Sequence, residues 1–150
     1  MKLESVRHEI RLAIEAAQDK QAEALILLKL PGETAFAEYF LLCSGSSDRQ
    51  IHTISDAIEE RLAREGVRLQ HREGKHSAEW MLLDYGNFIV HIFSERARIF
   101  YDLERLWRSA ERLEIPELNM HSRRRSELAP PDSPSNQSSE QDSEADRDRP

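Results

Sequence analysis

The chain has 150 residues, a length that fits one compact domain with its own hydrophobic core. Its formal net charge is -7, but seven acids and two bases lie within residues 126–150, so residues 1–125 carry a net charge of only -2. A nearly neutral body disfavours binding to bare DNA or RNA through a general positive field. The longest apolar run, residues 24–28, is too short to span a bilayer.

The two ends of the chain differ in character. The first residues alternate acids with arginines, unlike a signal peptide, and the single cysteine, Cys43, excludes an internal disulfide. We therefore expect a cytoplasmic protein with no membrane partner and no DNA partner. Residues 126–150 hold six serines, four prolines and three apolar side chains, a composition that predicts a disordered acidic tail. Three arginines at 123–125 precede it as a solvated basic hinge.

The first half of the body predicts a helix, two strands and a second helix. Apolar residues at three- and four-residue spacings predict an amphipathic helix over residues 4–20. The short apolar runs 24–30 and 39–43 are typical of central strands buried on both faces. Ser47 and Gln50 can cap a helix over residues 47–65, which Gly66 ends.

The second half predicts an edge strand, a hairpin and a last helix. Alternation over residues 67–71 favours a half-buried edge strand, and two apolar runs flank Gly86-Asn87, whose positive φ values suit a tight hairpin. Ser94 can cap a helix over residues 95–110 with an apolar inner face. That face consists of Ile99, Leu103, Leu106 and Trp107. A crossover helix and a hairpin together predict an α/β fold with a mixed sheet of about four or five strands and flanking helices.

The Ser44-Gly45-Ser46-Ser47 loop between a strand and a helix raises the alternative of a nucleotide-binding or nucleotidyl-transferring enzyme. Such an enzyme needs at least two converging carboxylates to hold its metal ions. Asp84 is the only plausible strand carboxylate apart from Glu38 and Glu79, so capping and a tight turn are the favoured roles of the loop. A thermal-shift screen with nucleotides and magnesium separates the two interpretations.

Other reactive residues favour structural roles. Cys43 lies in an apolar strand, where a thiol packs as a small core residue rather than acting as a nucleophile with His91. His71 and His76 have no third ligand nearby, so we expect no metal site and no cofactor. His91 alternates with apolar residues and is expected to be buried and hydrogen-bonded to a backbone carbonyl or to Asp84.

Aromatic residues gather around the hairpin and the last helix: Trp80, Tyr85, Phe100, Tyr101 and Trp107. They can fill a helix-on-sheet core or form a protein-binding patch, and the sequence leaves both open. Period two places Trp80, Leu82 and Asp84 on one strand face, with Met81, Leu83 and Tyr85 on the other. An acid among aromatic residues on a sheet face favours a partner that supplies a donor.

The motifs in these segments resemble the ribosomal silencing factor family, also called RsfS or Iojap. The resemblance covers residues 5–110 and ends near Trp107. Its carriers are Tyr39-Phe-Leu-Leu-Cys-Ser-Gly-Ser-Ser-Asp-Arg-Gln50, Glu73-Gly-Lys-His-Ser-Ala-Glu-Trp-Met-Leu-Leu-Asp-Tyr-Gly86, Ile89-Val-His-Ile-Phe93 and Phe100-Tyr-Asp-Leu-Glu-Arg-Leu-Trp107. One departure is Glu38, where the family is expected to carry Asp.

The resemblance implies a nucleotidyltransferase-like fold without the catalytic acids, and no enzymatic activity. It implies binding to the large ribosomal subunit through the ribosomal protein uL-fourteen, which sterically blocks association with the small subunit and represses translation. By position it assigns partner contacts to Trp80, Asp84, Tyr85, Gly86, Tyr101 and Leu103. Self-association implies a homodimer as a further partner. The expected organisation is a silencing-factor domain at 1–110, a basic extension at 111–125 and the acidic tail at 126–150.

Overall fold

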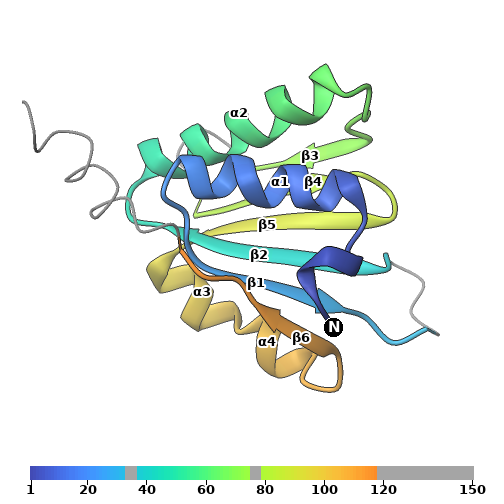
Figure 1. Ribbon diagram of the computed structural model, residues 1–150. Coiled ribbons are helices and arrows are strands. Elements are labelled where there is room, and N and C mark those ends of the chain that lie inside the picture. Colours follow the sequence, from blue (N-terminus) through green and yellow to red (C-terminus); the bar gives the residue numbers. More distant parts are fainter. Residues whose placement is uncertain (33–36, 75–78, 118–150) are drawn as a thin grey trace, which may run out of the picture. The chain divides into compact units, whose positions relative to one another are not determined.

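The computed structural model describes residues 1–32, 37–74 and 79–117, so the basic hinge and the acidic tail lie outside the described residues. A sheet of six strands in the order β3-β4-β5-β2-β1-β6 is covered by helices on both faces (Figure 1). The strands are β1 (Glu23–Lys29), β2 (Tyr39–Gly45), β3 (His71–Glu73), β4 (Trp80–Asp84), β5 (Phe88–Ser94) and β6 (Glu111–Glu114). The helices are a 3-10 turn (Leu3–Ser5), α1 (His8–Asp19), α2 (Asp48–Arg64), α3 (Glu95–Tyr101) and α4 (Leu103–Leu106).

The sheet is mixed, which confirms the predicted fold class. Strands β2 and β5 pair in parallel through the α2 crossover, while the β1–β2, β4–β5, β3–β4 and β1–β6 pairs are antiparallel. It has six strands rather than four or five because residues 111–114, assigned to the C-terminal extension, pair with β1 as an edge strand. Their sequence is polar apart from Leu113, so alternation gave no strand signal.

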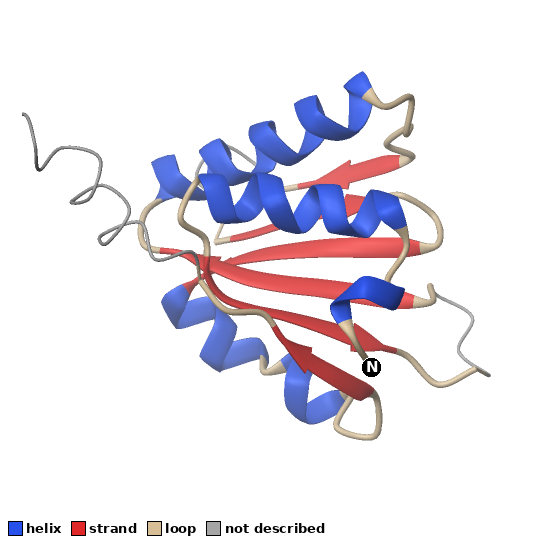
Figure 2. Ribbon diagram, in the orientation of Figure 1, coloured by secondary structure: helices blue, strands red, loops and turns tan. Residues whose placement is uncertain are grey.

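The helices α1 and α2 cover one face of the sheet, and α3 and α4 cover the other (Figure 2). Alternate strand residues separate two cores, as period two requires. Leu27, Leu41, Met81 and Val90 pack beneath α1 and α2. The opposite core contains Ile26, Leu28, Phe40, Leu42 and Phe93, with Trp80, Leu103 and Trp107 partly buried against it.

The predicted caps are confirmed with one refinement. The backbone N–H of Gln50 donates to Ser47 Oγ at 3.0 Å, and that of Ala97 donates to Ser94 Oγ at 3.0 Å. The Gln50 Oε1 atom, however, accepts from the backbone N–H of Ser46, one residue before the cap, at 2.7 Å. The Gln50 amide therefore closes the strand-to-helix loop rather than the cap itself.

Two predicted segments differ from the structure in their bounds. The first helix splits into the 3-10 turn and α1, and the edge strand lies at 71–73 instead of 67–71. In the hairpin Gly86 has a φ of 92°, while Asn87 has no positive φ. The positive φ of Gly86 favours glycine, and a Cβ atom on Gly86 would also lie 2.6 Å from Gln70 Nε2, so the Gln70 side chain would have to move.

The last predicted helix is wrong in one consequential respect. Instead of running through 95–110 it breaks at Asp102, which adopts the left-handed conformation with φ 48° and separates α3 from α4. The break turns the two halves differently, so the predicted inner face does not form. Leu103 and Trp107 pack on the core, but Ile99 is 79% exposed and Leu106 is 71% exposed.

Candidate functional site

Four large apolar side chains on α3 and α4 lie exposed, and we call them the α3–α4 patch: Ile99, Phe100, Tyr101 and Leu106. Phe100 is 77% exposed and Tyr101 is 48% exposed, and their rings meet edge to face with centroids 5.0 Å apart. Among the other large apolar residues that the structure describes, only Leu3 is also exposed, at 39%. The contacts of an ordinary folded surface do not explain such a cluster on two short helices.

Trp80, at the start of β4, joins the patch to the core beneath it. Its ring centroid lies 4.5 Å from that of Tyr101 and 4.9 Å from that of Phe93. Trp80 is partly buried against this core, so part of its surface remains accessible. The neighbouring strand β5 holds the ring from a second direction, because Trp80 Nε1–H donates to His91 Nδ1 at 3.0 Å.

His91 is buried as predicted, but its partner is Trp80 rather than a carbonyl or Asp84. The Phe40 ring meets the imidazole edge to face at 4.5 Å. Burial in these apolar surroundings lowers the pKa of His91 to about 3. The ring is therefore neutral at physiological pH.

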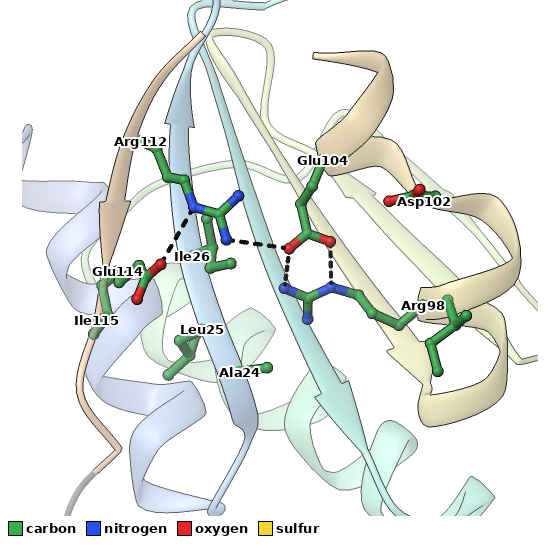
Figure 3. A pocket seen from close by; sticks show the side chains of 10 residues that line it. Ala24, Leu25, Ile26, Arg98, Asp102, Glu104, Arg112, Glu114 and Ile115 are labelled. Carbon is green, nitrogen blue, oxygen red and sulfur yellow. Dashed lines mark hydrogen bonds and ion pairs between the residues drawn. The ribbon is translucent and has the colours of Figure 1, made fainter. Parts of the chain in front are cut away.

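A charged network fixes the bend between α3 and α4 (Figure 3). Arg98 is buried and donates from Nε and Nη2 to the two Glu104 oxygens at 3.1 and 3.2 Å, and from Nη1 to Ser44 Oγ at 3.0 Å. Arg112 lies on the other side of the same Glu104 carboxylate at 3.7 Å. These groups line a cavity of about 510 Å³ between β1, β6 and the two helices.

A second cavity of about 480 Å³ borders the patch, lined by Glu79, Arg96, Ala97, Phe100 and Tyr101. Its rim carries an ion pair between Arg96 and Glu79. The hydrogen bond from Arg96 holds the pKa of Glu79 below its usual range. An aromatic wall with a charged rim resembles the anatomy of a protein interface, in which an apolar centre is surrounded by polar groups.

The predicted partner-binding residues fall into two groups. Trp80, Tyr101 and Leu103 lie together on the α3–α4 side of the sheet. Asp84 lies at the far end of β4, about 13 Å along the strand from Trp80. Its Oδ1 atom accepts from the backbone N–H of Gly86 at 2.8 Å. The carboxylate therefore has a hydrogen-bond donor within the hairpin turn and does not need one from a binding protein.

Tyr85 lies where alternation along the strand placed it, on the face opposite Trp80. It is only 6% exposed, packs in the α1–α2 core and stacks on Phe88 with ring centroids 5.0 Å apart. Burial raises the pKa of its hydroxyl. The ring is therefore not accessible to a docking protein in this conformation.

Sequence reasoning missed two members of the site, because Ile99 and Leu106 were assigned to a buried helix face. Phe100 belonged to the aromatic set that the sequence left open between core and protein-binding patch. The sequence around Asp102 contains no proline or glycine that would predict a break in the helix. The break is instead associated with a tertiary contact, the ion pair that Arg98 and Glu104, six residues apart, form across the bend. The density of aromatic residues and the family resemblance, which assigned contacts to Tyr101 and Leu103, pointed to this segment.

The three serine side chains of the loop at residues 44–47 are hydrogen-bonded within the protein. Ser44 Oγ accepts from Arg98, both the N–H and the hydroxyl of Ser46 bond to Gln50, and Ser47 caps α2. Burial raises the pKa of the Cys43 thiol to about 12. His76 lies outside the described residues. Across residues 1–32, 37–74 and 79–117 no group of three or more His, Cys, Asp and Glu side chains could hold a metal.

Nor does any described helix combine the length and the apolar character that crossing a membrane requires.

The sequence was compared with known proteins. It matches the family described as "Ribosomal silencing factor during starvation" over residues 3–146, so the expectation that the resemblance ends near Trp107 is wrong. It is 37% identical to the ribosomal silencing factor RsfS of Bacillus subtilis, over 67% of this chain and 86% of that protein.

More distant proteins agree with this match. The crystal structure of a protein from Chromobacterium violaceum superposes with a TM-score of 0.66 at 28% identity, covering 79% of this chain and 98% of the other. A mouse protein named "Mitochondrial assembly of ribosomal large subunit protein 1" is 26% identical over 67% of this chain and 46% of its own length. The chain belongs to the RsfS family of ribosomal silencing factors.

Proposed function

We propose that this protein binds the large ribosomal subunit through the ribosomal protein uL-fourteen, at the face where the small subunit docks. Occupying that face blocks subunit joining and represses translation in the cytoplasm. The α3–α4 patch together with Trp80 is the observation that carries the proposal. The name of the mouse relative, which refers to the large ribosomal subunit, supports this partner.

The composition of this surface suits protein recognition. Tryptophan and tyrosine are the residue types that contribute most at protein interfaces, because they bury a large area and keep a polar group at the rim. Trp80 and Tyr101 are in ring contact, Phe100 contacts Tyr101 from its exposed position, and Leu106 is exposed on α4. Arg96 and Glu79 supply the polar border.

The proposed mechanism is occlusion and needs no reacting group. A protein that covers the docking face excludes the small subunit by its volume alone, so affinity and position decide its effect. The internal bonds of Ser44, Ser46 and Ser47 support this interpretation over nucleotide transfer, because the loop's side chains are already engaged.

Cosedimentation with separated ribosomal subunits tests the proposal. We expect the full-length protein to pellet with the large subunit and not with the small one. Adding the missing subunit should then give fewer joined ribosomes as the protein concentration rises. Normal joining at saturating protein would refute the occlusion mechanism.

A pair of variants locates the contact. Phe100→Ser removes a fully displayed aromatic ring of the patch, and we expect the dissociation constant for the large subunit to rise roughly 30-fold or more. Leu3→Ser is the matched control, because Leu3 is an exposed apolar residue outside the patch. Equal binding of both variants would place the contact elsewhere.

The same surface is our candidate for self-association, since a homodimer would also bury the patch. Sedimentation equilibrium of the wild type and of Phe100→Ser decides this point. We expect any dimer to weaken in the variant and Leu3→Ser to leave it unchanged. A dimer that is indifferent to Phe100→Ser would use a different face.

A further inference from the structure

The hydrogen bond between Trp80 and His91 has a fixed direction. An indole N–H only donates, so His91 Nδ1 must be unprotonated and accept, which leaves the ring proton on Nε2. The two residues lie on neighbouring strands, where Trp80 pairs in register with Phe93 and His91 with Leu82. The bond therefore runs diagonally across the β4–β5 pair.

The imidazole makes no other hydrogen bond within the described part of the chain. Its Nε2 atom is buried without a partner, and the whole side chain is only 4% exposed. Phe40 covers it at 4.5 Å and Phe93 stacks parallel to it at 6.1 Å. A buried N–H without a partner destabilises the fold, so packing alone would favour a phenylalanine at this position.

The hydrogen bond to His91 affects the orientation of the Trp80 indole. Trp80 is half-buried and touches Tyr101 of the patch, so any rotation of the indole would change the surface that a partner meets. Phe93 packs on the indole, but an apolar contact does not fix its rotation, whereas a hydrogen bond is directional. The acceptor on β5 removes a rotational freedom that docking would otherwise have to remove.

We propose that His91 is a positioning residue for the docking surface: it holds the Trp80 indole in the orientation that the large ribosomal subunit recognises. This inference rests on the proposed function. His91 itself touches no partner. Its contribution is to preorganise the indole. When one interface side chain is no longer held in place before binding, the affinity falls roughly 3- to 10-fold.

Three variants separate the hydrogen bond from the packing. His91→Phe keeps a planar ring and removes the acceptor. His91→Asn is the rescue variant, because its Oδ1 takes the place of Nδ1 and can accept from the indole. Trp80→Phe removes the donor from the opposite side, and it also serves if His91→Phe does not fold.

The first measurement is the indole N–H signal in a proton–nitrogen correlation spectrum of the full-length protein, which contains two tryptophans. The signal lost in Trp80→Phe identifies Trp80. We expect His91→Phe to shift it strongly and His91→Asn to leave it near its wild-type position. An unchanged signal in His91→Phe would overturn the proposal, and this result does not depend on any ribosome.

The second measurement is affinity for the large subunit. We expect His91→Phe to weaken it roughly 3- to 10-fold, His91→Asn to stay close to wild type, and His91→Phe to add nothing in a Trp80→Phe background. Equal weakening in that background, or equal weakening by both His91 variants, would overturn the positioning role. A wild type that binds no large subunit would overturn the proposed function, while the spectrum still decides whether His91 holds Trp80.

Discussion

The two faces of the sheet are built differently although they share the same strands. Beneath α1 and α2 the strand side chains are almost all aliphatic and fully buried, among them Leu41, Leu83 and Val90. Beneath α3 and α4 the core mixes aliphatic residues with the rings of Phe40 and Phe93, and the same side of the sheet contains buried His91 and Arg98. Four large apolar side chains above it remain exposed, whereas α1 and α2 bury theirs.

This difference assigns separate tasks to the faces. The first face holds the larger cluster of buried apolar residues, as an ordinary helix-on-sheet layer does. The second face keeps apolar surface in water and fixes it with directional polar contacts. Strand β4 shows both tasks within five residues, since Leu83 points to the first face and Trp80 to the second.

The largest effect should come from the first face. Leu83→Ala removes a side chain that is completely buried between β4 and the α1–α2 layer. We expect the free energy of unfolding to fall by about 2–5 kcal/mol, because a cavity is left as well as lost burial. Urea denaturation measures this, and large-subunit affinity of the folded protein should not change. A loss of affinity larger than that of Phe100→Ser would contradict the division of tasks.

The next effect concerns the bend between α3 and α4. Glu104→Gln leaves the buried Arg98 guanidinium without its carboxylate, and we expect a loss of about 3 kcal/mol in unfolding free energy. Arg112→Ala is the matched control, since it removes only exposed-side ion pairs, to Glu104 at 3.7 Å and to Glu114 at 3.4 Å, and should cost about 1 kcal/mol or less. Similar losses for the two variants would show that the buried pair does not stabilise the bend.

The accuracy of the sequence-based predictions also differs between the two faces of the sheet. The mixed sheet, the α2 crossover, the Gly86 hairpin and both serine caps were predicted, because each depends on local periodicity or on one residue's backbone preference. Alternation also placed Met81 and Leu83 together on one strand face, which is the face that packs in the first core.

The second face depended on tertiary contacts that no local pattern records. The break at Asp102 is fixed by Arg98 and Glu104, and strand β6 exists because β1 offers it an edge. For the site, sequence reasoning placed Trp80, Tyr101 and Leu103 together, but put buried Tyr85 in the same group. Period two had already placed Tyr85 on the opposite face, so a consistent use of that rule would have excluded it.

The buried His91 gives the second face a pH dependence of stability in the acidic range. Its pKa is lowered to about 3 from an ordinary value of 6.5, so the folded state takes up fewer protons than the unfolded state between these values. The stabilisation is complete above pH 6.5 and is lost as the pH falls toward 3.

Comparison with His91→Asn isolates this contribution, because every other titrating group is retained. Between about pH 6.5 and 4.5 we expect the wild type to lose about 2–3 kcal/mol of unfolding free energy more than the variant does. Denaturation curves at a series of pH values measure the difference in slope. Parallel profiles would mean that His91 becomes protonated in the folded protein.

The smallest expected effect comes from Asp102, at the bend between α3 and α4. Substitutions there test whether the bend depends on the backbone conformation of Asp102 or on the contacts around it. Asp102 has φ 48° and no side-chain cap, so its backbone conformation costs free energy that glycine would not incur. We expect Asp102→Gly to raise the free energy of unfolding by about 0.5–1 kcal/mol and Asp102→Ala to lower it by about 1 kcal/mol. Thermal unfolding of both variants measures this.

Ala24, with φ 51° on β1, is the control for strain without a bend. Ala24→Gly should stabilise the protein by a similar amount and leave large-subunit affinity unchanged. Asp102→Gly should also keep its affinity, because Arg98 and Glu104 still fix how α3 and α4 present the patch. If Asp102→Gly instead gains stability and loses affinity, the two helices have joined and the patch has turned toward the core, and the restricted backbone of Asp102 is what keeps it facing the solvent.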